Sequence, residues 1–252
     1  MTRVAEPSPV DVVAPSARRR SRPALQVGVC VAGYLYGSLP FVYLLGRTRH
    51  VDLRARGSGN VGATNLWQVA GKGLAVAGWL ADASKGLLPG VAARTLGCPR
   101  PVYELASVCG VAGQCWPLFL DLSGGRGMSA FVGAALAIDP LAWGVSLLPM
   151  IGGALMRAVS LLGRRARDDG RRLMTTRGKA VPLGCLLATT LFPVIYRVVD
   201  RTRTTTLVPS LLPAVIVLRR MTARAPDDAE CGPAAHPVAL LYRLLYDRNT
   251  ST

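Results

Sequence analysis

Residues 25–46 read LQVGVCVAGYLYGSLPFVYLLG, a stretch without a single charged side chain. About 20 mostly apolar residues are enough for a helix to cross the hydrocarbon core of a bilayer. The stretch is too long to be the apolar region of a signal peptide, and further apolar stretches follow it. It therefore predicts the first of several transmembrane helices.

Similar apolar runs recur along the chain and set its architecture. They cover residues 72–96, 101–121, 127–156, 180–196 and 206–218. The run 127–156 is too long for one span, and Asp139-Pro140 divides it in two. We therefore predict an all-α, polytopic membrane protein with about seven transmembrane helices, some of them short and interrupted by Gly or Pro.

The composition agrees with this fold and argues against several other classes of protein. Of the 252 residues, 50% are hydrophobic and only 17% are charged. Soluble domains carry about 25% charged residues, so this chain has too few polar side chains to cover a globule. The same apolar bulk argues against disorder over most of the chain and against a nucleic-acid partner. The six cysteines form no CxxC pair and no metal-ligand spacing with the two histidines, so we expect free thiols and no bound metal.

Basic residues lie mostly between the apolar runs, and the formal net charge is +16. With seven spans, the basic connections all lie on one side: residues 47–56, 126, 157–179 and 219–224. The positive-inside rule places that side in the cytoplasm. The N-terminal arginines between residues 18 and 22 then lie outside, against the rule.

The ends of the chain differ from its middle in composition. We predict a disordered, Arg-rich tail over residues 1–24, a transmembrane domain over 25–225 and a soluble C-terminal tail over 226–252.

Residues 57–65 read GSGNVGATN and lie in the first basic connection. So many small residues can form a tight turn with exposed backbone N–H groups, and such a nest suits an anion. Ser58, Asn60, Thr64 and Asn65 add side-chain donors. The alternative is a flexible polar loop.

Residues 123–130 read SGGRGMSA and open an apolar run. The N-terminus of a helix offers N–H groups and a partial positive charge to an anion, and Arg126 adds a planar fork that suits phosphate. The glycines let the backbone approach a ligand closely. The alternative is an interhelical turn with one basic residue.

Asp82 and Lys85 are spaced i,i+3 inside an apolar run. A charge within a span costs roughly 2.5–3.5 kcal/mol, so such residues usually face the protein interior and pair. A structural ion pair is at least as good an interpretation as a catalytic role.

Four segments carry a family resemblance in chain order: GSLPFVYLLG (37–46), VDLRARGSGNVGATN (51–65), D-x-x-K-G (82–86) and WPLFLDLSGGRG (116–127). They resemble the acyl-phosphate-dependent glycerol-3-phosphate acyltransferases, bacterial membrane enzymes of phospholipid synthesis. The resemblance runs from about residue 27 to about 225, and makes 25–225 an acyltransferase-like domain. It implies seven helices and motif loops on the cytoplasmic face of the inner membrane, which agrees with the topology predicted from charge.

The resemblance implies a reaction and its participants. A fatty acyl group moves from acyl phosphate to the 1-hydroxyl of glycerol 3-phosphate, giving lysophosphatidic acid, with no cofactor. The expected partners are acyl phosphate, glycerol 3-phosphate and membrane lipid, with the enzyme that makes the acyl phosphate as a further candidate.

The resemblance also implies roles for individual residues. Ser58 and Arg126 would be catalytic. The residues that would bind substrate phosphate are Gly57, Gly59, Asn60, Thr64, Asn65, Gly124, Gly125, Gly127, Ser160 and Arg219.

Several positions depart from the family pattern. Gln114 stands in place of a histidine, Ser123 and Arg126 in place of lysines, and Gln68 in place of an arginine. A terminal His-Arg-Glu-Asn motif aligns with residues 218–221, Leu-Arg-Arg-Met, so its His and Asn are absent. Losing one preorganised donor can cost about 100- to 1,000-fold in rate.

These departures leave two other hypotheses open. One is a catalytically silent paralogue that binds phosphate or lipid, or regulates an active acyltransferase. The other is a small lipid or anion transporter, which has only general support from the helices and the intramembrane charge.

Overall fold

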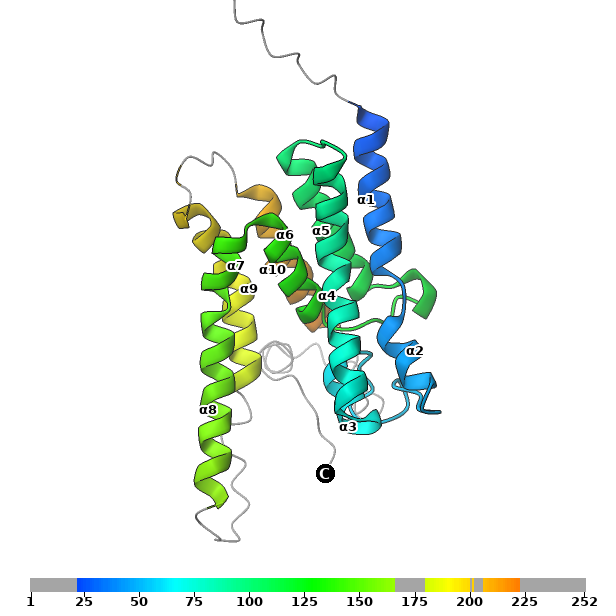
Figure 1. The fold of residues 1–252 in the computed structure, drawn as a ribbon, viewed down its shortest axis with the longest axis vertical. Helices are drawn as coiled ribbons and strands as arrows, with labels where there is room; N and C mark the ends of the chain where they lie inside the picture. Colours follow the sequence, from blue (N-terminus) through cyan, green and yellow to red (C-terminus); the bar gives the residue numbers. More distant parts are fainter. Residues whose placement is uncertain (1–21, 166–179, 200, 202–205, 223–252) are drawn as a thin grey trace, which may run out of the picture.

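The computed structural model describes residues 22–165, 180–199, 201 and 206–222. The predicted tails lie outside these residues, except for residues 22–24. Pro23 and Ala24 belong to the first helix, so the predicted N-terminal tail is two residues too long there. Within the described residues every regular element is a helix, which confirms the predicted all-α class (Figure 1).

The first apolar run forms two helices rather than one. Helix α1 covers Pro23–Gly37 and α2 covers Phe41–Arg47. Pro40 precedes α2 and cannot donate a backbone hydrogen bond, so the helix breaks at Leu39-Pro40.

The long helix α4 (Lys72–Thr95) follows the short helix α3 (Ala63–Ala70) and packs against α1, α5 and α6. Small residues allow its close contacts. A Cβ atom at Gly86 would lie 2.0 Å from the Ala130 carbonyl oxygen of α6 (Met128–Ile138), and one at Gly133 would lie 1.9 Å from the Ala83 carbonyl oxygen. Membrane helices commonly approach through small residues in this way.

The run 127–156 divides where Asp139-Pro140 predicts. Helix α7 (Pro140–Ser146) begins there, and the Asp139 carboxylate accepts a hydrogen bond from the Ala142 N–H at 2.7 Å. A second break follows at Leu147, and α8 then covers Leu148–Arg165. The prediction of one division was therefore incomplete.

The remaining elements complete the bundle. They are α5 (Arg100–Cys115), a 3₁₀ turn at Leu118–Leu120, α9 (Ala180–Val199) and α10 (Leu207–Thr222). Helices α7, α8 and α9 lie beside the group formed by α1, α4, α5 and α6, and α10 lies between them (Figure 1). The chain leaves α5 and α10, and enters α4 and α6, toward the end of the molecule where α2 and α3 lie.

The outer faces of several helices are apolar. Exposed large side chains include Val31 on α1, Leu155 on α8 and Val198 on α9. Among the described residues one helical stretch, Pro23–Arg47, is long and apolar enough to cross a membrane, and only 22% of its most apolar window is buried in the protein. Three apolar helices are shorter, so the count of about seven spans stays a prediction.

Candidate functional site

The loop over residues 57–65 is shaped from within by Asn65. The Asn65 Oδ1 atom accepts a hydrogen bond from the Ser58 N–H at 3.1 Å, and Nδ2 contacts the carbonyl oxygens of Leu53, Arg56 and Asn60 at 3.0 Å each. The side chain is 1% exposed. Asn65, a predicted phosphate ligand, thus uses its side-chain amide to bind backbone groups in and just before the loop. These contacts preorganise the loop.

Two glycines of this loop adopt left-handed backbone angles, with φ of +65° at Gly57 and +67° at Gly59. A Cβ atom at Gly57 would lie 2.1 Å from the Asn65 Oδ1 atom, so only glycine fits there. Ser58 and Asn60 are half-buried in the loop, and Thr64 is exposed in the first turn of α3.

The second glycine loop connects the 3₁₀ turn to α6. Gly124 and Gly125 are buried. The Gly125 N–H donates to the Gln114 carbonyl oxygen at 3.1 Å. Arg219 of α10 donates from Nη2 to the Gly124 carbonyl oxygen at 2.7 Å and from Nε to the Gly125 carbonyl oxygen at 3.2 Å. The predicted phosphate ligand Arg219 therefore holds the loop, with two of its guanidinium nitrogens on backbone carbonyls.

Arg126 and the start of α6 make this loop electropositive. Gly127, with φ of +76°, precedes α6, and no side chain caps that helix. Burial, together with the nearby positive charges of Arg220 and Arg219, lowers the pKa of Arg126 to about 10. Such a gathering of positive charge at a helix N-terminus favours a bound anion.

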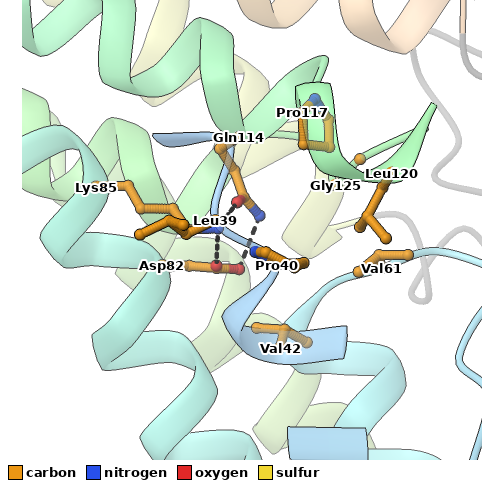
Figure 2. Close-up of a pocket in the computed structure, with 11 residues that line it drawn as sticks. Leu39, Pro40, Val42, Val61, Asp82, Lys85, Gln114, Pro117, Leu120 and Gly125 are labelled. Atoms are coloured by element: carbon orange, nitrogen blue, oxygen red, sulfur yellow. Dashed lines mark hydrogen bonds and ion pairs between the residues drawn. The ribbon is translucent and has the colours of Figure 1, made fainter. Parts of the chain in front are cut away.

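The two glycine loops meet. A Cβ atom at Gly125 would lie 2.8 Å from the Val61 carbonyl oxygen of the first loop. Residues of both loops, including Val61, Gly124 and Gly125, line one pocket, and Leu39 and Pro40 add an apolar wall (Figure 2).

Buried polar side chains form the floor of this pocket (Figure 2). The predicted ion pair is present, with 3.0 Å between Lys85 Nζ and Asp82 Oδ1 and both side chains 2% exposed. Gln114 lies between the loops and this pair. Its Nε2 atom donates to Asp82 Oδ2 at 2.8 Å, and its Oε1 atom accepts from Lys85.

Ser160 lies on α8, a helix that carries none of the other predicted site residues. The resemblance predicts it near the start of a loop, but α8 continues to Arg165, so Ser160 is inside the helix. The extensive contacts of α8 are with α9. A direct phosphate contact from Ser160 stays a prediction.

The most informative residue that sequence reasoning missed is Gln114. The sequence indicates it only as a departure from the family histidine, whereas in the structure it connects the ion pair with the Gly-rich loop. The available signal was its position two residues before Trp116-Pro117, in the apolar run that follows the one with Asp82 and Lys85. No cluster of metal ligands occurs among the residues whose positions are described.

Comparisons with known proteins agree with this geometry. The family profile described as glycerol-3-phosphate acyltransferase matches residues 27–225. A glycerol-3-phosphate acyltransferase of Geobacter sulfurreducens is 32% identical over 185 residues, which cover 73% of this chain and 84% of the relative. Another, from Rubrobacter xylanophilus, is 40% identical over 116 residues, which are 46% of this chain and only 58% of that protein's length.

A solved structure extends the likeness to three dimensions. The glycerol 3-phosphate form of PlsY (YgiH), an integral membrane glycerol 3-phosphate acyltransferase, is 26% identical with a TM-score of 0.61. The likeness covers 77% of this chain and 88% of the PlsY chain. Profile, relatives and structure cover overlapping parts of the same helical region, so the chain belongs to the glycerol-3-phosphate acyltransferase family.

Proposed function

We propose that this chain is an integral membrane acyltransferase that moves a fatty acyl group from acyl phosphate to the 1-hydroxyl of glycerol 3-phosphate. The observation that carries the proposal is the contact between the two glycine loops, which line one pocket, with Arg126 directly after Gly125 in the second loop. Both substrates bear phosphate, and both loops are built to approach an anion closely. The PlsY structure supports the acceptor, because that protein was solved in a glycerol 3-phosphate form.

The proposed chemistry is a direct displacement at the acyl carbon. The 1-hydroxyl oxygen attacks the carbonyl carbon, and the bond from that carbon to the phosphate oxygen breaks. The departing phosphate takes the hydroxyl proton, so the products are lysophosphatidic acid and inorganic phosphate.

The chain's own groups would orient and stabilise this exchange. The Arg126 guanidinium and the first N–H groups of α6 would bind phosphate, and Ser58 would contribute a hydroxyl donor from the first loop. Donors fixed before the reaction stabilise developing charge without reorganising. Asp82 is paired with Lys85 and Gln114 and is 2% exposed, so its role is to support the pocket floor.

We place the reaction at the cytoplasmic face of a bacterial inner membrane. The basic connections favour that orientation through the positive-inside rule. The apolar outer faces of α1, α8 and α9 would contact lipid, which lets an acyl chain remain in the bilayer while its phosphate reaches the loops.

A specific observation favours the second candidate, a catalytically silent relative. Leu218 and Met221 occupy the aligned positions of the family's His and Asn, and both are exposed near the end of α10. Such a protein would bind phosphate or phospholipid without turnover.

Acyl transfer by the purified protein separates the two candidates. We expect lysophosphatidic acid from acyl phosphate and glycerol 3-phosphate, and a large loss in the Ser58→Ala variant. Acyl coenzyme A as the only donor tests the donor class, and we expect no product from it. Wild-type protein that makes no more product than Ser58→Ala, yet binds phosphate, would establish the silent alternative.

A further inference from the structure

The end of α5 offers a backbone acceptor next to the Gly-rich loop. The last carbonyl groups of a helix lack partners within it. Gln114 is the penultimate residue of α5, and its carbonyl oxygen accepts the Gly125 N–H at 3.1 Å. The position of this one peptide group therefore helps to decide where Gly125 lies.

The side chain of the same residue is held at both ends of its amide. Nε2 donates to Asp82 Oδ2 at 2.8 Å, and Oε1 accepts from Lys85 (Figure 2). Gln114 is 6% exposed, and the two α4 residues are 2% exposed, so these contacts are largely shielded from bulk water. An amide fixed in this way loses its rotamer freedom, and its own backbone is fixed with it.

The loop fits tightly around this residue. A Cβ atom at Gly124 would lie 2.3 Å from the Gln114 carbonyl oxygen, and one at Gly125 would lie 2.8 Å from Gln114 Nε2. A small rotation of Gln114 would therefore move both glycines. Arg219 contacts the same glycines through their carbonyl oxygens, so the loop is gripped by α5 and α10.

We infer that Gln114 is a positioning residue, which couples the buried Asp82–Lys85 ion pair to the Gly124–Gly125 loop and holds that loop in its phosphate-binding shape. The inference rests on the proposed function for the identity of the anion. In the family pattern a histidine stands here, so the chain achieves the coupling with an amide that donates and accepts at once.

Phosphate binding by detergent-purified protein tests the inference without requiring turnover. Inorganic phosphate that binds the folded state raises the thermal unfolding midpoint. Gln114→Met keeps the size of the side chain and removes its polar contacts. We expect it to require about 10-fold more phosphate for the same rise, as loss of a buried hydrogen-bonded group permits.

Ser107→Ala is the matched control, because Ser107 is also fully buried on α5 but is not among the residues that line the pocket. It is expected to respond to phosphate as wild type does. An unchanged phosphate requirement in Gln114→Met, or a wild-type protein that shows no response, would overturn the inference.

Gln114→Glu supplies a second readout in case the Met variant does not fold. The charged groups that contact residue 114 are Asp82 and Lys85 on α4. Arg219 of α10 contacts the two glycines that pack on residue 114, and Arg126 follows them in the loop. A protonated glutamic acid can donate to Asp82 as the amide does, whereas a glutamate would repel it. We expect the ratio of the variant's phosphate requirement to that of wild type to fall as the pH is lowered from 8 to 5.5, and a ratio independent of pH would contradict the coupling.

Enzyme kinetics test the proposed acyl transfer and the positioning role of Gln114 together, and their outcomes distinguish the two. If the protein transfers acyl groups, Gln114→Met should raise KM for acyl phosphate more than it lowers kcat. A protein that transfers no acyl group but loses phosphate binding in Gln114→Met would refute the proposed function and leave the positioning role of Gln114 intact.

Discussion

Single polar side chains give the two glycine loops their shape. Asn65 binds four backbone groups, two in the first loop and two in the residues just before it, and Arg219 binds two carbonyl groups of the second loop. Both are polar residues beside a proposed anion site, yet they act on the protein rather than extending toward a ligand. Substitutions at these positions should therefore change loop geometry first and ligand contacts second.

Gly57→Ala should disrupt the first loop. The backbone there is left-handed, and the added methyl group would collide with Asn65 Oδ1 at 2.1 Å. Such strain costs about 1–3 kcal/mol, so we expect acyl transfer to fall by at least about 10-fold. The control is Gly73→Ala, because a Cβ atom at Gly73 in α4 meets nothing within 4 Å. Helix propensity favours alanine there, so the control should be as stable as wild type or more so; equal activity in both variants would contradict the structure of the loop.

The low pKa of Arg126, about 10, predicts a pH effect on anion binding. The charged guanidinium attracts phosphate, so affinity should be full well below pH 10 and should fall as the pH rises through 10. The free energy of unfolding of the ligand-free protein should change with pH in the opposite direction. The folded state holds fewer protons than the unfolded state between about pH 10 and the ordinary arginine range, so folding gains stability as the pH rises there.

Phosphate-dependent thermal stabilisation at pH 8 and pH 10.5 measures this effect. Arg126→Gln should bind phosphate more weakly and should lose less affinity between the two pH values. A variant with the same pH dependence as wild type would place the titrating group elsewhere.

Sequence alone predicts two glycine-rich loops at 57–65 and 123–130, and the structure brings them together. The sequence could not assign the contacts within these loops, and anion binding by them stays a prediction. Whether Asn65 contacts phosphate or the Leu53 carbonyl depends on how the chain returns on itself, and no local pattern encodes that. The role of Gln114 could not be predicted for the same reason, because its side-chain partners are on another helix.

At the scale of elements, a polar cluster joins three helices at the end away from the loops. Tyr196 of α9 donates to Glu104 of α5 at 2.6 Å, and Arg100 binds the same carboxylate oxygen at 2.8 Å. Arg100 also lies 4.0 Å from Asp139, which begins α7. The cluster thus ties α5, α7 and α9 together.

Tyr196→Phe should lower stability without reaching the glycine loops. The change leaves the Glu104 carboxylate, which is 4% exposed, with one donor fewer. We expect a loss of about 1–3 kcal/mol in the free energy of unfolding, because the hydrogen bond has a charged acceptor. The half-saturating phosphate concentration should not change. Tyr103→Phe, on the same helix as Glu104, is the control, and a loss of phosphate binding in Tyr196→Phe would show that the two ends are coupled.

The helix boundaries show what local sequence can predict. Asp139-Pro140 divides an apolar run because proline and a capping carboxylate favour the start of a helix, and the structure has that division. Leu39-Pro40 also breaks its run, but hydropathy is continuous across it, so a single span was predicted there. The break is understandable only with the pocket in view, because Leu39 and Pro40 form part of its wall.

At the scale of the whole molecule, the helices separate two ends, and exposed apolar side chains lie on their outer faces. The glycine loops and α3 lie toward one end, and the α4–α5 turn lies at the other (Figure 1). An enzyme that joins a lipid-borne donor to a water-soluble acceptor requires this separation, because the acyl chain and the phosphates prefer different surroundings. The proposed orientation in the membrane follows from which end carries the basic connections.

Cysteine labelling of intact cells tests this arrangement. In a variant without native cysteines, single cysteines replace Thr64, Ser123 or Leu96, all of which are exposed. Thr64 and Ser123 flank the two glycine loops, whereas Leu96 follows α4 at the opposite end. A membrane-impermeant maleimide should label only the Leu96→Cys variant from outside, and should label the other two after the membrane is opened. Labelling of Thr64→Cys and Ser123→Cys from opposite sides would separate the two loops and so remove the shared site on which the proposed acyl transfer depends.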